Sequence, residues 1–168
     1  LDVAALSFVQ RSNPEDEVFI IHFDFDARVS QSFTGDHGLL EQTLAAAQPF
    51  GQTALYDSVL LALETMENAR YPKKALLLIT DGIDNVSTHT LDQVVEEVKR
   101  SHVTVFAVGL LSESGGSAAE ESLIKIAETS GGRAYFPENV DQAHTMMERI
   151  ARDLREQYTL GYFPVNET

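Results

Sequence analysis

The chain has 168 residues, the size of one domain, and contains no cysteine, which excludes a disulfide framework, a thiolate metal site and a cysteine nucleophile. Its 26 acidic residues outnumber its 12 lysines and arginines, and both halves of the chain are acidic. An acidic surface disfavours nucleic acid and anionic lipid, and it is compatible with a divalent cation or a basic partner. The acidity also has a simpler interpretation, since it keeps a protein soluble.

Three short apolar runs predict buried parallel strands. They are rich in β-branched, aromatic and leucine side chains, and they are far shorter than the ~20 residues that a membrane helix needs. Near-continuous apolar strands are typical of a parallel sheet that is covered on both faces. The runs are VFIIHF at 18–23, ALLLIT at 75–80 and VTVFAV at 103–108.

Amphipathic helical patterns alternate with these runs. Helices are predicted over 2–10, 37–47, 55–66, 91–98, 119–130 and 140–154. A further strand at 27–33 follows a tight turn at 24–26, and edge strands are predicted at 133–136 and 158–163. The alternation predicts an α/β fold with a doubly wound, mostly parallel, Rossmann-like sheet flanked by helices, in a single domain spanning 1–168.

The first predicted helix, at 2–10, leads directly into a buried strand. In a doubly wound sheet such a helix normally connects two parallel strands. We therefore expect a central strand before this helix, and none is present in the printed sequence.

Two segments carry the candidate site. Ligands bind at the carboxyl ends of the strands in open α/β sheets, and Asp81 directly follows ALLLIT, with Asp84 close behind. These carboxylates suit a hard cation, although an Asp-Gly turn also explains Asp81. Thr53 precedes a predicted helix and Asp57 lies in its first turns, so helix capping and the helix dipole explain both without a metal.

Taken together, the segments resemble the von Willebrand factor A domain, the fold of the integrin I domain. The resemblance lies in the order and spacing of EVFIIHFDFDARV, GQTALYDSV, KKALLLITDGIDNVS, VTVFAVGL and SGGRAYF, which cover nearly the whole chain. The tail EQYTLGYFP is similar to the end of a bacterial, acidobacterial branch of such domains, which are mostly exported. The resemblance thus implies a periplasmic or secreted protein.

The family holds Mg²⁺ or Mn²⁺ at a metal-ion-dependent adhesion site. Thr53 and Asp81 match its threonine and its last aspartate, whereas its Asp-x-Ser-x-Ser loop has no counterpart in this sequence. The resemblance therefore implies a domain that lacks its first strand and this loop, with weak metal binding or none, because Mg²⁺ requires nearly octahedral oxygen ligands. Asp24 and Asp26, with Asp57 and Asp84, are candidates for the rim of the site or for hydrogen bonds to its ligands.

The function that the resemblance implies is non-enzymatic. The cation would engage an acidic residue of a protein partner, with no nucleic-acid partner and no membrane insertion. One alternative is an interaction scaffold with the same fold and no metal. The other is a metal-dependent phosphohydrolase that uses the Asp24-Phe25-Asp26 acids, but Lys73 and Lys74 are expected at the opposite edge of the sheet.

Overall fold

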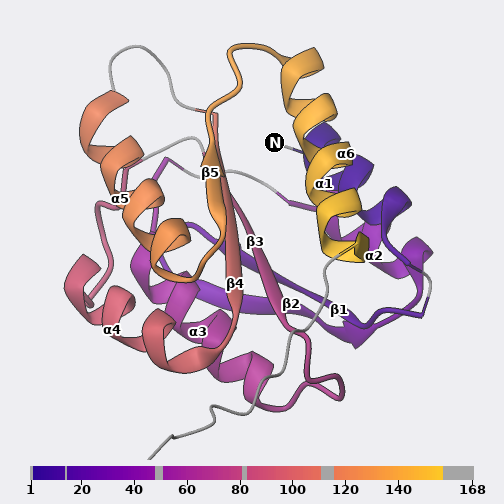
Figure 1. Ribbon diagram of the computed structural model, residues 1–168, viewed down its shortest axis with the longest axis horizontal. Coiled ribbons are helices and arrows are strands. Elements are labelled where there is room, and N and C mark those ends of the chain that lie inside the picture. Colours follow the sequence, from indigo (N-terminus) through magenta and orange to yellow (C-terminus); the bar gives the residue numbers. More distant parts are fainter. Residues whose placement is uncertain (1, 14, 48–50, 81–82, 111–115, 157–168) are drawn as a thin grey trace, which may run out of the picture.

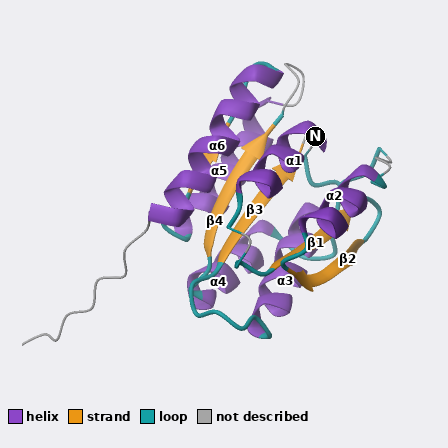
Figure 2. Ribbon diagram, turned by 90° about the vertical axis from the view of Figure 1, so that its right-hand side faces the viewer, coloured by secondary structure: helices purple, strands orange, loops and turns teal. Residues whose placement is uncertain are grey.

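The strands form two groups between layers of helices (Figures 1 and 2). The computed structural model describes residues 2–13, 15–47, 51–80, 83–110 and 116–156. In one group β3 (Ala75–Thr80), β4 (Thr104–Gly109) and β5 (Arg133–Tyr135) are parallel, in the order β3-β4-β5. In the other, β1 (Val18–Phe23) and β2 (Ala27–Thr34) form an antiparallel hairpin. The α/β class and the strand positions agree with the sequence analysis to within about a residue, apart from the strand expected at 158–163, which lies outside the described residues.

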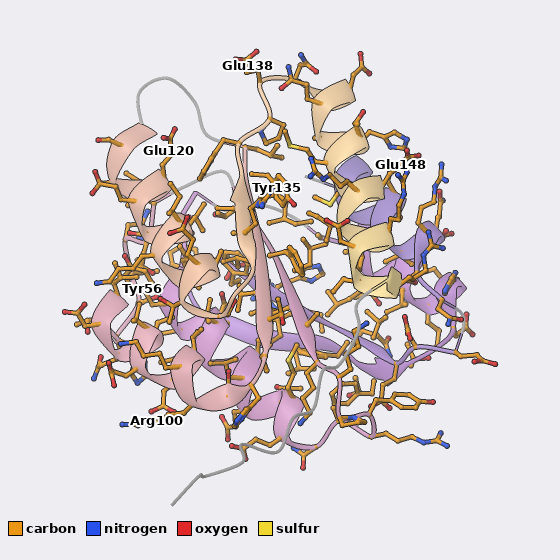
Figure 3. The ribbon with its side chains drawn as sticks, viewed as in Figure 1. Tyr56, Arg100, Glu120, Tyr135, Glu138 and Glu148 are labelled. Carbon is orange, nitrogen blue, oxygen red and sulfur yellow. The ribbon has the colours of Figure 1, made fainter. Side chains whose placement is uncertain are left out.

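Three helices cover each face of the strands. One face carries α1 (Asp2–Arg11), α2 (His37–Ala45) and α6 (Val140–Glu156), and the other carries α3 (Leu55–Glu67), α4 (Leu91–Ser101) and α5 (Gly116–Thr129). Helices α1 and α6 lie side by side in both ribbon views, and Glu148 of α6 accepts a hydrogen bond from Arg11 of α1 (Figures 1 to 3). All six predicted helices are present, and their ends differ from the predicted ones by a few residues.

The core is centred on β4, whose side chains alternate between the two helical layers. Val105 and Ala107 pack with α3, α4 and α5, and Phe106 and Val108 pack with α6. Five of the six β4 residues are buried, as expected of an apolar strand covered on both faces. The equally apolar strands β1 and β3 are largely half-buried.

A close backbone contact fixes the end of α5 against β4. Gly131 has φ +80°, and the amides of Gly131 and Gly132 donate to the carbonyl oxygens of Glu128 and Ala127, which closes the last turn of the helix. A Cβ atom on Gly132 would lie 1.9 Å from the carbonyl oxygen of Val105. Only glycine lets the chain pass this close to the central strand.

Candidate functional site

Three loops meet at the carboxyl ends of β1 and β3. We call residues 24–26, 51–54 and 83–90 the loop edge. The Ala54 amide donates to the carbonyl oxygen of Asp24 at 2.9 Å, which ties the second loop to the first. The Thr53 amide donates to Asn85 Oδ1 at 3.0 Å, and the Asn85 amide donates back to the Thr53 carbonyl oxygen at 3.1 Å. Thr53 therefore lies on a connected surface, the loop edge. The other predicted site residues that the structure describes lie on the loop edge or next to it.

Thr53 does not cap α3, and the capping interpretation of this residue is wrong. The helix begins at Leu55, and its N-cap residue is Ala54, which makes no side-chain hydrogen bond to the helix. The Thr53 backbone is instead fully used in the reciprocal pair with Asn85. Among the described residues, none hydrogen-bonds the Thr53 hydroxyl.

The first turn of α3 is capped by side chains from the loop after β3. The Tyr56 amide donates to Asp84 Oδ1 at 3.2 Å, and the Asp57 amide donates to Ser87 Oγ at 3.1 Å. The Ser87 hydroxyl also donates to Asp84 Oδ1. Amides in the first turn of a helix have no partner within it, so these side chains supply what Thr53 does not. The hydroxyl of Tyr56, labelled in Figure 3, lies 3.3 Å from Ser122 Oγ, which anchors this turn to α5.

Asp57, in the first turn of α3 as predicted, holds the far end of the same loop. Its carboxylate accepts hydrogen bonds from the Thr88 amide at 2.9 Å, the Thr88 hydroxyl and the His89 amide, and His89 Nδ1 lies 2.8 Å away. Partial burial acts to raise the pKa of Asp57, but the hydrogen bonds from Thr88 and His89 outweigh it and lower the pKa below its ordinary value.

Asp24 and Asp26 flank the β1–β2 turn and share one arginine. Arg28 donates to both oxygens of Asp24, at 3.2 and 3.3 Å, and to Asp26 at 3.1 Å. The Arg28 hydrogen bond is the main cause of the lowered pKa of Asp24. The Asp24 side chain is 13% exposed, whereas that of Asp26 is 75% exposed. Both acids are therefore joined to the hairpin by Arg28, and their place at the rim of a cation site stays a prediction.

The described side chains do not make up a complete cation site. Asp81 lies outside the described residues. Within 83–90 and the other described ranges, no group of three or more His, Asp and Glu side chains is arranged to hold a metal. The carboxylates of Asp24, Asp57 and Asp84 are already engaged by Arg28, by Thr88 with His89, and by Tyr56 with Ser87. Recruiting any of them to a metal would cost the hydrogen bonds that hold the loop edge together.

Two exposed apolar side chains on the loop edge were not predicted. Phe25, between the two acids of the hairpin turn, is 65% exposed, and Ile83, after β3, is 41% exposed. A large apolar residue within an otherwise polar turn was the available signal in both DFD and DGID. Contiguous exposed apolar patches are a common feature of protein–protein contact sites.

The two lysines considered for phosphate binding lie at the opposite end of β3, as expected. Lys74 Nζ donates to the Met66 carbonyl oxygen at 2.5 Å, and Lys73 Nζ donates to the Leu154 carbonyl oxygen. Both precede the first residue of β3, whereas the loop edge follows its last. Neither lysine can therefore meet a ligand held by Asp24 and Asp26.

A comparison with models of protein families shows the family of this chain. The model of the von Willebrand factor type A domain matches residues 3–149. The chain belongs to this family. The match confirms the resemblance inferred from the motifs, while the acidobacterial branch stays a prediction.

Several solved structures share the fold. A von Willebrand factor type A protein from Catenulispora acidiphila has a TM-score of 0.78 at 15% identity, over 91% of this chain and 37% of that one. The von Willebrand domain of the type V pilus tip protein Mfa5 from Porphyromonas gingivalis has a TM-score of 0.73 at 15% identity, over 97% and 90%. BatB from Bacteroides thetaiotaomicron, a conserved hypothetical protein, has a TM-score of 0.69 at 18% identity, over 93% and 87%. The present domain thus spans little more than a third of the first of these relatives.

Curated protein sequences give no match to this von Willebrand A domain. In the described ranges, none of the helices combines the length and apolar character needed to cross a bilayer.

Proposed function

We propose that this von Willebrand A domain is a protein-binding module whose contact surface is the loop edge. Domains of this family commonly bind proteins, and one similar structure is the tip protein of a pilus. The observation that carries the proposal is the pair Phe25 and Ile83, which are exposed on two loops whose backbones are both hydrogen-bonded to residues 53–54.

The hydrogen bonds within the loop edge prepare it for binding. Asp84, Ser87 and Asn85 connect the loop after β3 to residues 53–57, and Ala54 connects that segment to Asp24. A surface that is already ordered loses less conformational entropy when a partner binds. Phe25 and Ile83 supply apolar contact area, and the surrounding acidic and amide groups form a polar rim.

Replacing both apolar side chains should abolish most partner binding. We expect the double variant Phe25→Ser, Ile83→Ser to lose about tenfold or more of its affinity, because truncating one of the few side chains that dominate an interface costs more than about 1 kcal/mol. The measurement is the amount of cell-envelope protein retained by the immobilised domain, followed by a titration with the protein identified.

The matched control carries the same chemical change elsewhere. Leu39 and Tyr71 are 44% and 39% exposed and lie outside the loop edge, on α2 and before β3. The variant Leu39→Ser, Tyr71→Ser should bind as the unaltered domain does. Equal losses in the two variants, at equal melting temperatures, would show that the loop edge is not the contact surface.

The finer form of the proposal adds a Mg²⁺ or Mn²⁺ ion, bound by Thr53 and Asp81, that engages an acidic side chain of the partner. The family resemblance supports this form. The described residues do not complete such a site, because the neighbouring carboxylates hold the loops together. A hydroxyl and one carboxylate are a poor substitute for the six oxygens that Mg²⁺ prefers.

A metal titration distinguishes the form of the proposal that includes a bound cation from the form without one. We expect the melting temperature after EDTA treatment to stay constant as Mg²⁺ or Mn²⁺ is added to millimolar concentration. A tightly bound ion at 100 times its dissociation constant would instead add about 2.7 kcal/mol of stability. A saturable rise that is lost in both Thr53→Ala and Asp81→Ala would overturn the expectation and establish a working cation site. A constant melting temperature supports the metal-free scaffold for this chain.

The proposal also covers whether the domain is an enzyme and where the protein is located. We infer a non-enzymatic role, and the position of Lys73 and Lys74 away from Asp24 and Asp26 supports it over phosphate hydrolysis. We also infer an exported protein, periplasmic or secreted. The presence of a pilus tip protein and a minor pilin from Streptococcus sanguinis among the similar structures supports that location.

A further inference from the structure

The loop edge that carries Phe25 and Ile83 is also acidic. Its segments 24–26, 51–54 and 83–90 contain three aspartates, one histidine and no lysine or arginine. Arg28 of β2 adjoins them, but its guanidinium group is already hydrogen-bonded to Asp24 and Asp26. The whole chain has a formal charge of −14 at pH 7. A partner therefore approaches this surface through a negative field, which attracts cationic groups and repels carboxylates.

Phe25 and Asp26 present an apolar and a charged group next to each other in the hairpin turn. Both side chains are largely exposed. Asp26 accepts a hydrogen bond from Arg28 through Oδ1, and within the described part of the chain its other oxygen, Oδ2, accepts none. The Asp24 side chain is mostly buried, and Arg28 holds both of its oxygens. Asp26 is therefore the carboxylate of this turn that can contact a partner.

Arg28 shows that a guanidinium group fits the carboxylates of the turn. Its Nη1 atom lies 3.2 Å from Asp24 Oδ1 and 3.1 Å from Asp26 Oδ1. One positive charge is thus shared by two negative ones, and the turn keeps a negative charge. A second cationic group would balance that charge, whereas a partner carboxylate would add to it.

We propose that the partner of the loop edge is a protein segment in which an arginine or lysine lies next to a large apolar side chain. The apolar side chain packs on Phe25 and Ile83, and the basic group pairs with Asp26. This inference rests on the proposed function, because it names the partner of the same surface. It gives the partner a positive charge, whereas a contact bridged by a metal ion requires an acidic side chain.

The charge and the apolar pair have different roles in this contact. An exposed ion pair adds little affinity, because solvent screens it. The negative field acts mainly on the rate of association and on which partners are admitted. The apolar side chains supply the larger part of the affinity, as in the proposed function.

The test uses a random peptide library displayed on phage as the probe and the whole domain as the immobilised target. Selection in millimolar Mg²⁺ also leaves a cation-bridged contact available. We expect the selected peptides to carry arginine or lysine close to an aromatic or aliphatic side chain, and to bind more weakly as the NaCl concentration rises. Asp26→Asn should weaken their binding about two- to fivefold, the range of an exposed ion pair.

Glu97→Gln is the matched control for Asp26→Asn. Glu97 also pairs with an arginine, Arg100, and its side chain is half exposed. This pair lies toward the carboxyl end of α4, the helix that leads to the amino end of β4, where Figure 3 labels Arg100. Both substitutions remove one negative charge from the chain, so they change the overall field equally. Glu97→Gln should bind the selected peptides as the unaltered domain does.

The outcomes distinguish a wrong partner from a wrong surface. Acidic peptides, or peptides without a charge preference, that lose binding in Phe25→Ser, Ile83→Ser would overturn this inference and leave the proposed function in place. Equal effects of Asp26→Asn and Glu97→Gln would also overturn it. Peptides that bind the double serine variant as well as the unaltered domain, or a selection that yields none, would contradict the proposed function and this inference with it.

Discussion

Gly132→Ala should destabilise this domain by about 3 kcal/mol, near the upper end for overpacking. The new Cβ atom would lie 1.9 Å from the carbonyl oxygen of Val105 and 2.8 Å from its carbonyl carbon. Both atoms belong to the backbone of β4, the central strand of the core, so no side-chain rotation relieves the contact. For a domain of this size, the expected loss corresponds to about 6–12 °C in melting temperature.

Two other glycines serve as controls for Gly132→Ala. Gly131 has φ +80° with nothing within 4 Å of the position that a Cβ atom would take, so Gly131→Ala should cost only about 1–2 kcal/mol for the left-handed backbone. Gly51 has equally open surroundings and no positive φ, so Gly51→Ala should leave the melting temperature unchanged. A Gly132→Ala protein that melts within a degree of Gly51→Ala would contradict the close approach of this turn to β4.

Asp57→Asn should destabilise the domain by about 1–2 kcal/mol at pH 7. The charged carboxylate accepts hydrogen bonds from the amides of Thr88 and His89, and bonds to a charged acceptor contribute more than neutral ones. The amide group of asparagine keeps the shape but turns one acceptor into a donor, which faces an N–H group. Urea unfolding of the two proteins at pH 7 measures the difference.

The pH dependence of that difference follows from the pKa of Asp57. Its hydrogen bonds hold the pKa in the folded protein below the ordinary value of 3.8. The stabilisation by the carboxylate is therefore complete above 3.8 and is lost as the pH falls through the lower, folded-state pKa. The stability gap between the unaltered protein and Asp57→Asn should therefore shrink as the pH falls below about 3.8.

An exposed aspartate provides the comparison for Asp57. Asp92 also lies in the first turn of a helix and pairs with Lys125, but its side chain is 86% exposed. Asp92→Asn should therefore cause no measurable change at pH 7, because solvent screens an exposed pair. A gap for Asp57→Asn that matched Asp92→Asn, or that widened toward low pH, would show that the carboxylate does not hold the loop after β3.

Local sequence patterns predicted most of the secondary structure of this domain. Runs such as ALLLIT and the spacing of apolar residues in 140–154 identify a buried strand and an amphipathic helix, because burial and periodicity are properties of neighbouring residues. Helix ends were less well predicted, since they depend on individual caps such as the Thr90–Gln93 capping box at the start of α4. The order of the motifs was also enough to place the chain in its family.

The polar residues of the candidate site were identified by type, but their partners were not. The sequence assigned the cap of α3 to Thr53, two positions before the helix, whereas Asp84 and Ser87 provide it from about thirty residues further along the chain. The same distant contacts engage Asp57 and Asp84, which the sequence had offered as neighbours of a metal. Contacts between segments so far apart depend on how the strands are arranged, and no local pattern encodes them.

The sequence by itself determined the α/β class, the positions of five strands and six helices, and the acidic character of the surface, because each follows from composition or from short-range periodicity. The strand that it predicts before the helix at 2–10 stays a prediction. Only the tertiary structure showed that Asp84 and Ser87 cap α3 from a distant loop, and only it showed Phe25 and Ile83 exposed on connected loops. Both facts depend on which loops meet, and this is decided when distant segments of the chain pack together.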